Sequence, residues 1–153
     1  MSGLPGSGKS TWVKKQLNNK GGFWASRDAM RFSMVREDEP YFEREPEVFN
    51  AWISQICTAL CNPLVEDIYI DATHLNDKSR EKTLSRLPKD NIEKITNVVV
   101  VVPIETCLER NALRTGREVV PEDAISNMAK SFKMPKKYNT VVVDAAGREN
   151  VHE

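Results

Sequence analysis

The feature that most constrains this chain is a glycine-rich segment close to its N-terminus. Residues 3–11 read Gly-Leu-Pro-Gly-Ser-Gly-Lys-Ser-Thr and match the pattern G-x-x-x-x-G-K-[ST] at every position. Glycines let the backbone adopt positive φ angles, so that successive N–H groups turn toward one anion at the start of a helix. The lysine and the hydroxyl residue that follow suit phosphates and Mg²⁺. The segment therefore predicts a phosphate-binding loop that handles a nucleoside triphosphate.

We expect this loop to hold the phosphates of ATP through Gly6, Ser7, Gly8, Lys9, Ser10 and Thr11. Lys9 is expected to reach the β- and γ-phosphates and to take part in catalysis, and the Ser10 hydroxyl is expected to bind Mg²⁺. The alternative is a simple turn before a helix. The amphipathic helix pattern that follows, with Trp12, Val13 and Leu17 before the glycine pair at 21–22, favours the phosphate-binding loop.

The strand expected before the phosphate-binding loop is missing from this sequence. A phosphate-binding loop normally follows a hydrophobic strand, but only Met1 and Ser2 precede Gly3. A strand needs about five residues. We expect the native start to lie upstream, with Met1 as an internal residue; a gap in the sheet or another segment in that place are the alternatives.

Helix and strand patterns alternate along the rest of the chain, as they do in a parallel α/β sheet. Strands are predicted over 23–25, 68–71, 98–102 and 140–143. Helices are predicted over 29–35, 47–60, 77–87, 104–114 and 121–133, with a loop or broken helix over 37–46. Because no repeat or linker interrupts the pattern, we predict a single domain over residues 1–153.

Charge and composition narrow the function classes. The formal net charge is zero, with 22 Lys+Arg against 22 Asp+Glu, so the overall charge does not favour a nucleic-acid partner. Basic residues do gather late in the chain, at Lys130, Lys133, Lys136 and Lys137, where they could line a phosphodiester path. The three cysteines and two histidines are too few and too scattered for a zinc cluster. Since no apolar run approaches the roughly 20 residues of a membrane span, we expect no membrane partner and a cytoplasmic location.

Two carboxylates follow predicted strands. Asp71 ends an apolar strand, at the edge where ligands bind in such sheets, and is the candidate second anchor for Mg²⁺. Asp28 follows the strand before it and can accept a proton from an attacking hydroxyl, while Arg31 lies on the same helix face and can hold an anionic group. The alternatives are helix caps for Asp71 and Asp28, the latter as N-cap of the 29–35 helix, and a surface role for Arg31.

Three arginines gather near the end of a predicted helix, at Arg110, Arg114 and Arg117. Gly116 breaks the helix, and the loop it begins could close over the active site, where arginines neutralise charge on a transferring phosphoryl group. Arg117 could equally complement the helix dipole.

Together these motifs resemble the phage-type 5′-hydroxyl polynucleotide kinases and the wider group of small P-loop kinases. The resemblance covers nearly the whole chain and rests on residues 5–12, Arg27-Asp28 with Arg31, residues 71–76, Arg110-Asn111, Arg114, Gly116, Val120-Pro121 and residues 130–132. It implies that Asp28 is the general base, that Arg31 contacts the substrate phosphate beside the 5′-hydroxyl, and that Arg114 is the lid arginine on the γ-phosphate. We also expect Thr73 at the substrate and Arg110 at the nucleotide.

The resemblance implies an α/β fold of the P-loop kinase type, with a parallel sheet flanked by helices on both faces and a helical lid. It implies an enzyme that uses ATP and Mg²⁺ to phosphorylate a hydroxyl, with the 5′ end of RNA or DNA as the favoured acceptor and nucleic-acid repair as the setting, in the host cytoplasm if the chain is phage-encoded. The first alternative is a kinase of sugars, nucleosides or other metabolites. The second is a nucleotide-binding switch, which the base candidate Asp28 disfavours because a switch has no acceptor alcohol.

Overall fold

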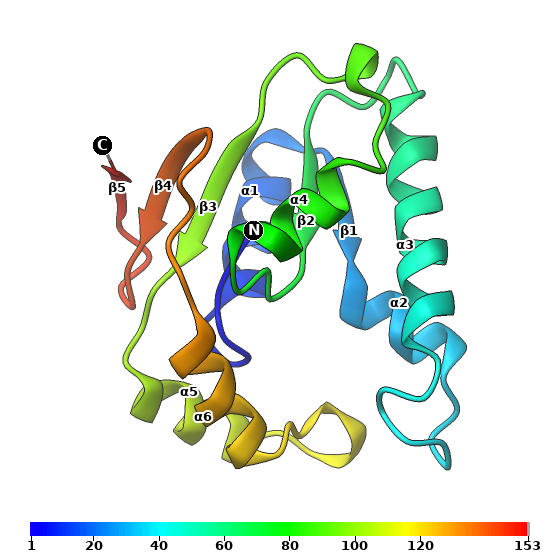
Figure 1. Ribbon diagram of the computed structural model, residues 1–153. Helices are drawn as coiled ribbons and strands as arrows, with labels where there is room; N and C mark the ends of the chain where they lie inside the picture. The colour runs from blue at the N-terminus through cyan, green and yellow to red at the C-terminus, as the bar shows by residue number, and fades with distance from the viewer. Residues whose placement is uncertain (153) are drawn as a thin grey trace.

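The strands form two short, adjacent sheets in the computed structural model, which describes residues 1–152 (Figure 1). β1 (Phe23–Ser26) pairs in parallel with β2 (Ile68–Asp71). In the second sheet β3 (Thr96–Val100) pairs in parallel with β4 (Asn139–Val143), and β4 pairs antiparallel with β5 (Glu149–His152). The predicted parallel α/β arrangement is confirmed.

Helices cover the strands from both sides. They are α1 (Lys9–Lys20), α2 (Arg27–Met34), α3 (Glu45–Leu60), α4 (Asp77–Leu84), α5 (Ile104–Ala112) and α6 (Glu122–Ser131), with 3-10 turns η1 at Lys89–Asn91 and η2 at Gly116–Glu118. Figure 1 shows α1 behind the strands and α4 in front of them, α3 beside β1, and α5 and α6 together at one end. In the described part of the chain, no helix combines the length and the apolar character needed to cross a membrane.

The N-terminal residues lie between the two sheets, where the expected strand before the loop belongs. The Met1 nitrogen donates to Ile70 O on the β2 side at 2.7 Å. On the β3 side, Ser2 N donates to Val98 O at 2.8 Å and Val100 N donates to Ser2 O at 2.9 Å. Ser2 thus forms a single parallel bridge with Val99 rather than a full strand. Two residues join the halves of the sheet at the position that leads directly into the phosphate-binding loop.

Several element boundaries differ from the predicted ones for local reasons. β3 begins and ends two residues earlier than predicted. Val101 N still donates to Val143 O at 2.8 Å, and Pro103, which lacks an N–H, ends the run. α3 begins at Glu45 rather than at 47, since Pro46 is tolerated in the first turn. The last helices end at Leu84, Ala112 and Ser131, short of the predicted residues 87, 114 and 133. β5 was not predicted, because its residues are exposed and mostly polar.

The N-cap of α2 is Ser26, not Asp28. The Ser26 Oγ accepts a hydrogen bond from Ala29 N at 3.1 Å, so the helix begins one residue before Asp28. The capping alternative for Asp28 is therefore wrong. Asp28 lies in the first turn of α2, and its carboxylate does not cap the helix.

The largest apolar cluster fixes β1, and with it the start of α2. Trp52, Ile53 and Ile56 of α3 are buried against Ala25 of β1. The Trp52 indole also donates from Nε1 to Ala25 O at 2.9 Å, so a buried polar group is paired inside the core. This packing holds the residues that follow β1 at one edge of the sheet.

Candidate active site

The main cleft lies at the carboxyl ends of the strands and has a volume of about 930 Å³. Ligands in open α/β sheets bind at this edge. The cleft is lined by the phosphate-binding loop, by α2 and the segment around Tyr41, and by residues of α5, α6 and the segment between them. The cleft thus brings together residues from distant parts of the chain.

The loop conformation depends on glycine at two positions. Gly6 and Gly8 have φ angles of 79° and 103°, which side chains other than glycine rarely adopt. A Cβ at Gly6 would also lie 2.7 Å from Cys107 O of α5, so any larger residue would push the loop away from that helix. The loop ends at Lys9, the first residue of α1, so its N–H groups lie at a helix N-terminus, where an anion can bind.

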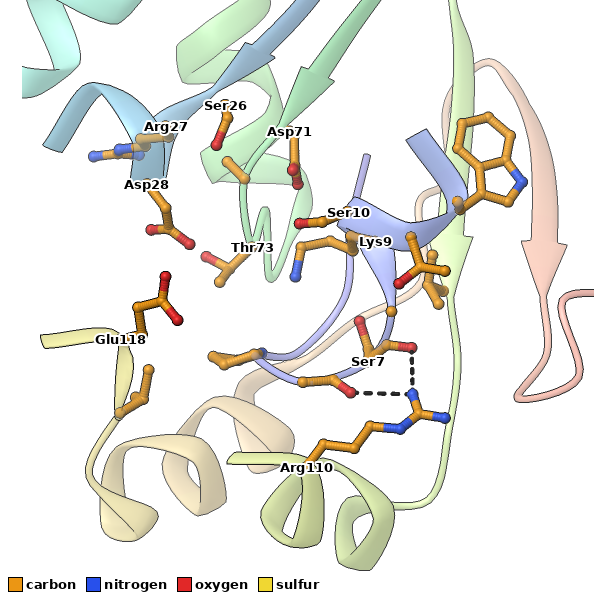
Figure 2. Close-up of a pocket in the computed structure, with 18 of the residues that line it drawn as sticks. Ser7, Lys9, Ser10, Ser26, Arg27, Asp28, Asp71, Thr73, Arg110 and Glu118 are labelled. Atoms are coloured by element: carbon orange, nitrogen blue, oxygen red, sulfur yellow. Dashed lines mark hydrogen bonds between the residues drawn. The ribbon is translucent and has the colours of Figure 1, made fainter. Parts of the chain in front are cut away.

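Arg110 braces the loop from α5. Its Nη1 donates to Gly6 O at 3.2 Å and to Ser7 O at 3.3 Å, as Figure 2 shows. These bonds hold two loop carbonyls outward. The Ser7 side chain is buried, and its Oγ has no hydrogen-bond partner in the described chain, which leaves a donor for a ligand at the loop. Thr11 is exposed at the start of α1 and also lines the cleft.

The Lys9 ammonium lies at the centre of the site. Its Nζ donates to Gly3 O and to Leu4 O, each at 3.0 Å, which curls the side chain over the loop. Burial lowers the pKa of Lys9, against the opposing effects of the carboxylates Asp71 and Asp28. A cation held at the loop and flanked by acidic groups is suited to phosphate oxygens and to the charge that develops during phosphoryl transfer.

Asp71 and Ser10 are the two residues that could offer oxygen ligands to Mg²⁺. The Asp71 carboxylate is 6% exposed and accepts from the Trp24 indole Nε1 at 3.1 Å. Burial raises its pKa, while Lys9 opposes that shift. Figure 2 shows the exposed Ser10 hydroxyl beside this carboxylate. A carboxylate and a hydroxyl fit Mg²⁺, which takes few protein ligands and completes its octahedron with phosphate oxygens and water. When bound, the ion would neutralise phosphate charge.

Asp28 reaches into the cleft from the first turn of α2. Its side chain is 68% exposed, and Figure 2 shows the carboxylate directed toward Thr73 and the Lys9 ammonium. Arg31 Nη1 donates to its Oδ1 at 2.5 Å, and Tyr41 OH donates to the same oxygen at 3.0 Å. Two donors therefore orient the carboxylate without enclosing it. Burial raises the pKa of Tyr41 to about 12, so that its hydroxyl keeps the proton it donates.

Arg31 lines the cleft, but its guanidinium is already paired within the chain, and its predicted contact with a substrate phosphate remains a prediction. The residue is 5% exposed, and its Nε donates to Glu45 Oε1 at 2.6 Å. Its Nη2 lies 2.5 Å from the same oxygen, and its guanidinium stacks on the Tyr41 ring, 4.6 Å from the centroid. Because these acceptors occupy the guanidinium, Arg31 supports Asp28 rather than offering a free anion site. Glu45 and Tyr41 were missed from the sequence, where no local pattern links them to Arg31.

Thr73 connects the loop to the segment after β2. Its carbonyl accepts from Gly3 N at 3.1 Å. Its side chain points into the space between Asp28 and Lys9 in Figure 2, where a substrate hydroxyl would meet both groups. The prediction that Thr73 contacts the substrate remains a prediction.

The segment between α5 and α6, residues 113–121, is the one expected to act as a lid and is called the lid region below. It is attached to α2. Arg114 lines the cleft and donates from Nη1 to Glu118 O at 3.3 Å. Arg117 reaches across to donate from Nη2 to Phe32 O at 3.0 Å and to Val35 O at 2.8 Å, with its guanidinium 4.6 Å from the Phe32 centroid. Arg117 therefore satisfies carbonyls at the end of α2, not of its own helix. The Glu118 carboxylate, which was not predicted, faces Asp28 across the cleft in Figure 2.

The late basic residues lie outside the cleft. Lys133 N donates to Leu75 O at 2.7 Å, and Lys137 Nζ lies 3.4 Å from Glu81 Oε1, so this segment packs against α4 and the turn before it. None of the four lysines named above lines the cleft of the described structure. The hypothesis that they line a phosphodiester path into the active site is not supported by this placement.

Three solved structures similar to this chain are kinases. A gluconokinase from Sinorhizobium meliloti 1021 matches with a TM-score of 0.61 and 21% identity, over 95% of this chain and 80% of its own. An unliganded sugar kinase from Janibacter sp. HTCC2649 matches with a TM-score of 0.61 and 18% identity, over 95% and 83%. A deoxyadenosine kinase from M. mycoides with bound dATP matches with a TM-score of 0.51 and 19% identity, over 95% and 89%. At these identities the likeness shows the fold.

The family comparison is more direct. The family model AAA_33, described as an AAA domain, matches residues 1–135, which include the phosphate-binding loop, Asp28, Asp71 and the arginines at 110, 114 and 117. Together with the loop geometry and the arrangement of sheet and helices, this match shows that the chain belongs to the AAA_33 family and has the α/β fold of P-loop kinases.

Proposed function

We propose that the chain is an ATP-dependent kinase that transfers a γ-phosphoryl group to a hydroxyl of a small molecule. The observation that carries the proposal is the placement of Asp28 and Lys9 in one cleft, a carboxylate open to an acceptor opposite a cation at the phosphate-binding loop. A protein that only binds or slowly hydrolyses a nucleotide has no need of a carboxylate held at this point by Arg31 and Tyr41.

In the proposed reaction Asp28 accepts the proton of the acceptor hydroxyl, whose oxygen attacks the γ-phosphorus. The bond from that phosphorus to the β–γ bridging oxygen breaks, and ADP leaves with the bond's electron pair. Lys9 lies at the loop, where it offsets charge on the phosphates, and Arg114 offers a second cation from the lid. Proton acceptance by a positioned base contributes about 10²–10⁴ in rate.

The acceptor side of the cleft favours an acceptor without many negative charges. It exposes the carboxylates of Asp28 and Glu118. The nearest guanidinium groups on that side are already paired, Arg31 with Asp28 and Glu45, and Arg27 with Glu45 at 2.7 Å. Like charges repel, so an anionic polymer would gain little here. The names of the similar structures, which include a gluconokinase and a deoxyadenosine kinase, agree with small hydroxylated acceptors.

One observation favours a second candidate, a kinase of the 5′-hydroxyl of RNA or DNA. Tyr41 and Phe42 line the cleft with their rings in edge-to-face contact, and Phe42 is 53% exposed. An exposed aromatic ring beside the base candidate could stack a nucleobase, which contributes about 1–3 kcal/mol per base. This candidate also agrees with the sequence motifs, which resemble those of the phage-type polynucleotide kinases.

The test is phosphoryl transfer from γ-labelled ATP to a panel of acceptors. The panel contains sugars and polyols, nucleosides, 3′-nucleotides and 5′-hydroxyl oligonucleotides, each with the parent protein and with Asp28→Asn. Label transfer to a sugar, polyol or nucleoside that is lost in Asp28→Asn supports the small-molecule proposal. Transfer confined to oligonucleotides and 3′-nucleotides supports the second candidate, and absence of transfer to any hydroxyl, with ATP bound, overturns both.

A further inference from the structure

A second pocket, of about 320 Å³, lies on the outer side of the site between the start of α3 and α4. Three cationic side chains line it, Arg27 from the start of α2 and Lys82 and Arg86 from α4 and the turn that follows. Phe49 forms its base, and Asn50 and Glu45 complete the wall. Arg27 and Glu45 also line the main cleft, but none of the nucleotide, metal or base candidates of the cleft belongs to this pocket.

The three cations converge on one aromatic ring. The Lys82 Nζ lies 4.9 Å from the Phe49 centroid, and the guanidinium carbons of Arg27 and Arg86 lie 5.3 and 5.8 Å from it. Each gains from the face of the ring, but three like charges this close to one point repel one another. The arrangement therefore calls for a negative charge among them.

The chain itself supplies too little negative charge. Glu45 is the sole carboxylate in the lining, and it pairs with Arg27 through one oxygen and with buried Arg31 through the other. Arg86 donates to the neutral Asn50 Oδ1 at 3.4 Å. Among residues 1–152, neither Lys82 nor Arg86 forms an ion pair. The pocket is thus lined by three cationic side chains and by a single carboxylate, which it shares with Arg31.

One nitrogen of the Arg27 guanidinium is unpaired within the described chain. The Arg27 Nε is buried and has no hydrogen-bond partner within the described residues. Buried donors are nearly always paired in folded proteins, because an unpaired one loses its bond to water without replacement. This nitrogen has almost no exposed surface, so a ligand in the pocket would meet the outer nitrogens of the guanidinium rather than Nε.

We propose that this pocket, defined by Arg27, Lys82 and Arg86, binds a phosphate group. Two guanidinium groups and one ammonium match a tetrahedral oxyanion, since a guanidinium binds phosphate oxygens in pairs and an ammonium adds a point charge. The group is either free inorganic phosphate or the phosphoryl group of a small phosphomonoester. The site lies outside the phosphate-binding loop, so the inference does not depend on the proposed kinase activity.

The test measures phosphate binding with the loop already filled. Inorganic phosphate is titrated calorimetrically into the protein saturated with Mg²⁺ and a non-hydrolysable ATP analogue, and into Lys9→Ala without nucleotide. The double variant Lys82→Ala/Arg86→Ala should weaken binding by about 10- to 100-fold, as expected for loss of charge-assisted hydrogen bonds. The matched control Lys78→Ala/Lys89→Ala removes two exposed lysines from the same region with the same charge change.

Equal dissociation constants in the double variant and the control would overturn the proposal, as would the absence of saturable binding to the parent in both backgrounds. A parallel titration with glycerol 3-phosphate identifies the source of the group. Equal affinity for the two anions assigns free phosphate, and at least tenfold tighter binding of glycerol 3-phosphate assigns a phosphomonoester. Thermal melting of each variant checks that it is folded. We expect folded variants, because Lys82 and Arg86 are exposed and outside the apolar core.

Discussion

Arg31 and Asp28 form an ion pair in which the arginine is buried and the carboxylate is open to the cleft. The Nη1–Oδ1 distance is 2.5 Å, while the side chains are 6% and 68% exposed. Burying a guanidinium is favourable only when its donors are paired, and Glu45 and Tyr41 complete that pairing. The buried arginine therefore fixes the position of the base candidate Asp28, while the exposed side of its carboxylate stays free for an acceptor.

Lys9→Ala is expected to abolish phosphoryl transfer, because it removes the cation that the loop holds beside the phosphates. The measurement is label transfer from ATP to whichever panel acceptor the parent protein phosphorylates. Lys20→Ala, at the exposed end of α1, is the control and should retain parent activity. Transfer by Lys9→Ala near the parent rate would rule out the role assigned to the loop.

Asp28→Asn is expected to lower kcat by about 10²–10⁴ and to leave ATP binding nearly intact, since the amide can still accept hydrogen bonds but not a proton. Thermal stability should change little, because Ser26 rather than Asp28 caps α2. Steady-state kinetics and a melting curve measure the two effects. A variant that melts early with an unchanged kcat would show that Asp28 is structural.

Glu45→Gln is expected to lower kcat more than it changes KM for ATP, because Glu45 acts on Asp28 through Arg31. The free energy of unfolding should fall by about 1–3 kcal/mol, since the substitution leaves the buried Arg31 guanidinium short of a charged partner. Urea unfolding measures this loss. Glu47→Gln, which breaks the exposed ion pair with Arg44 on the same helix, should cost at most about 1 kcal/mol and leave kcat unchanged.

Arg117→Ala is expected to free the lid region from α2. Two charge-assisted bonds to Phe32 O and Val35 O and the contact with the Phe32 ring would be lost. Backbone amides over residues 113–120 should exchange with deuterium at least about tenfold faster in the variant. Arg148→Ala, at an exposed position, serves as the control; equal exchange in the two variants would contradict an attachment through Arg117.

His74 is expected to make the fold sensitive to acid. Its Nδ1 lies 2.8 Å from Met1 O and its Nε2 lies 3.0 Å from Thr83 Oγ1, which fits a neutral ring that donates from Nδ1. Burial lowers its pKa from 6.5 to about 3, and the Met1 ammonium and the more distant cations Arg27 and Arg80 add to the shift. The unfolded chain therefore binds a proton that the folded chain does not between these values.

Stability should consequently fall as the pH drops below 6.5, with a slope that approaches about 1.4 kcal/mol per pH unit until the pH reaches about 3. Urea unfolding at a series of pH values measures the slope. His74→Gln keeps a polar side chain that does not titrate, and it should show a shallower dependence over this range. Parallel curves for parent and variant would show that His74 does not contribute.

Several parts of the site could be read from local sequence because local geometry decides them. The loop follows from its glycines and from the helix that starts at Lys9, since the backbone conformation of a short segment depends on its own residues. Asp71 could be placed at the strand edge because an apolar strand pattern ends at that residue. Asp28 could be placed at the same edge for the same reason, but the sequence did not show that Ser26 is the N-cap of the helix that carries it.

Other parts depended on contacts between segments far apart in the chain. Glu45 and Tyr41 contact Arg31 because α3 packs beside α2, and Arg117 reaches Phe32 because the lid region folds over the end of that helix. Met1 and Ser2 join the two sheets through backbone bonds to β2 and β3, which no pattern in two residues can indicate. A hydrogen bond between distant residues has no periodic trace in the sequence, because its energy depends on packing that only the folded chain provides.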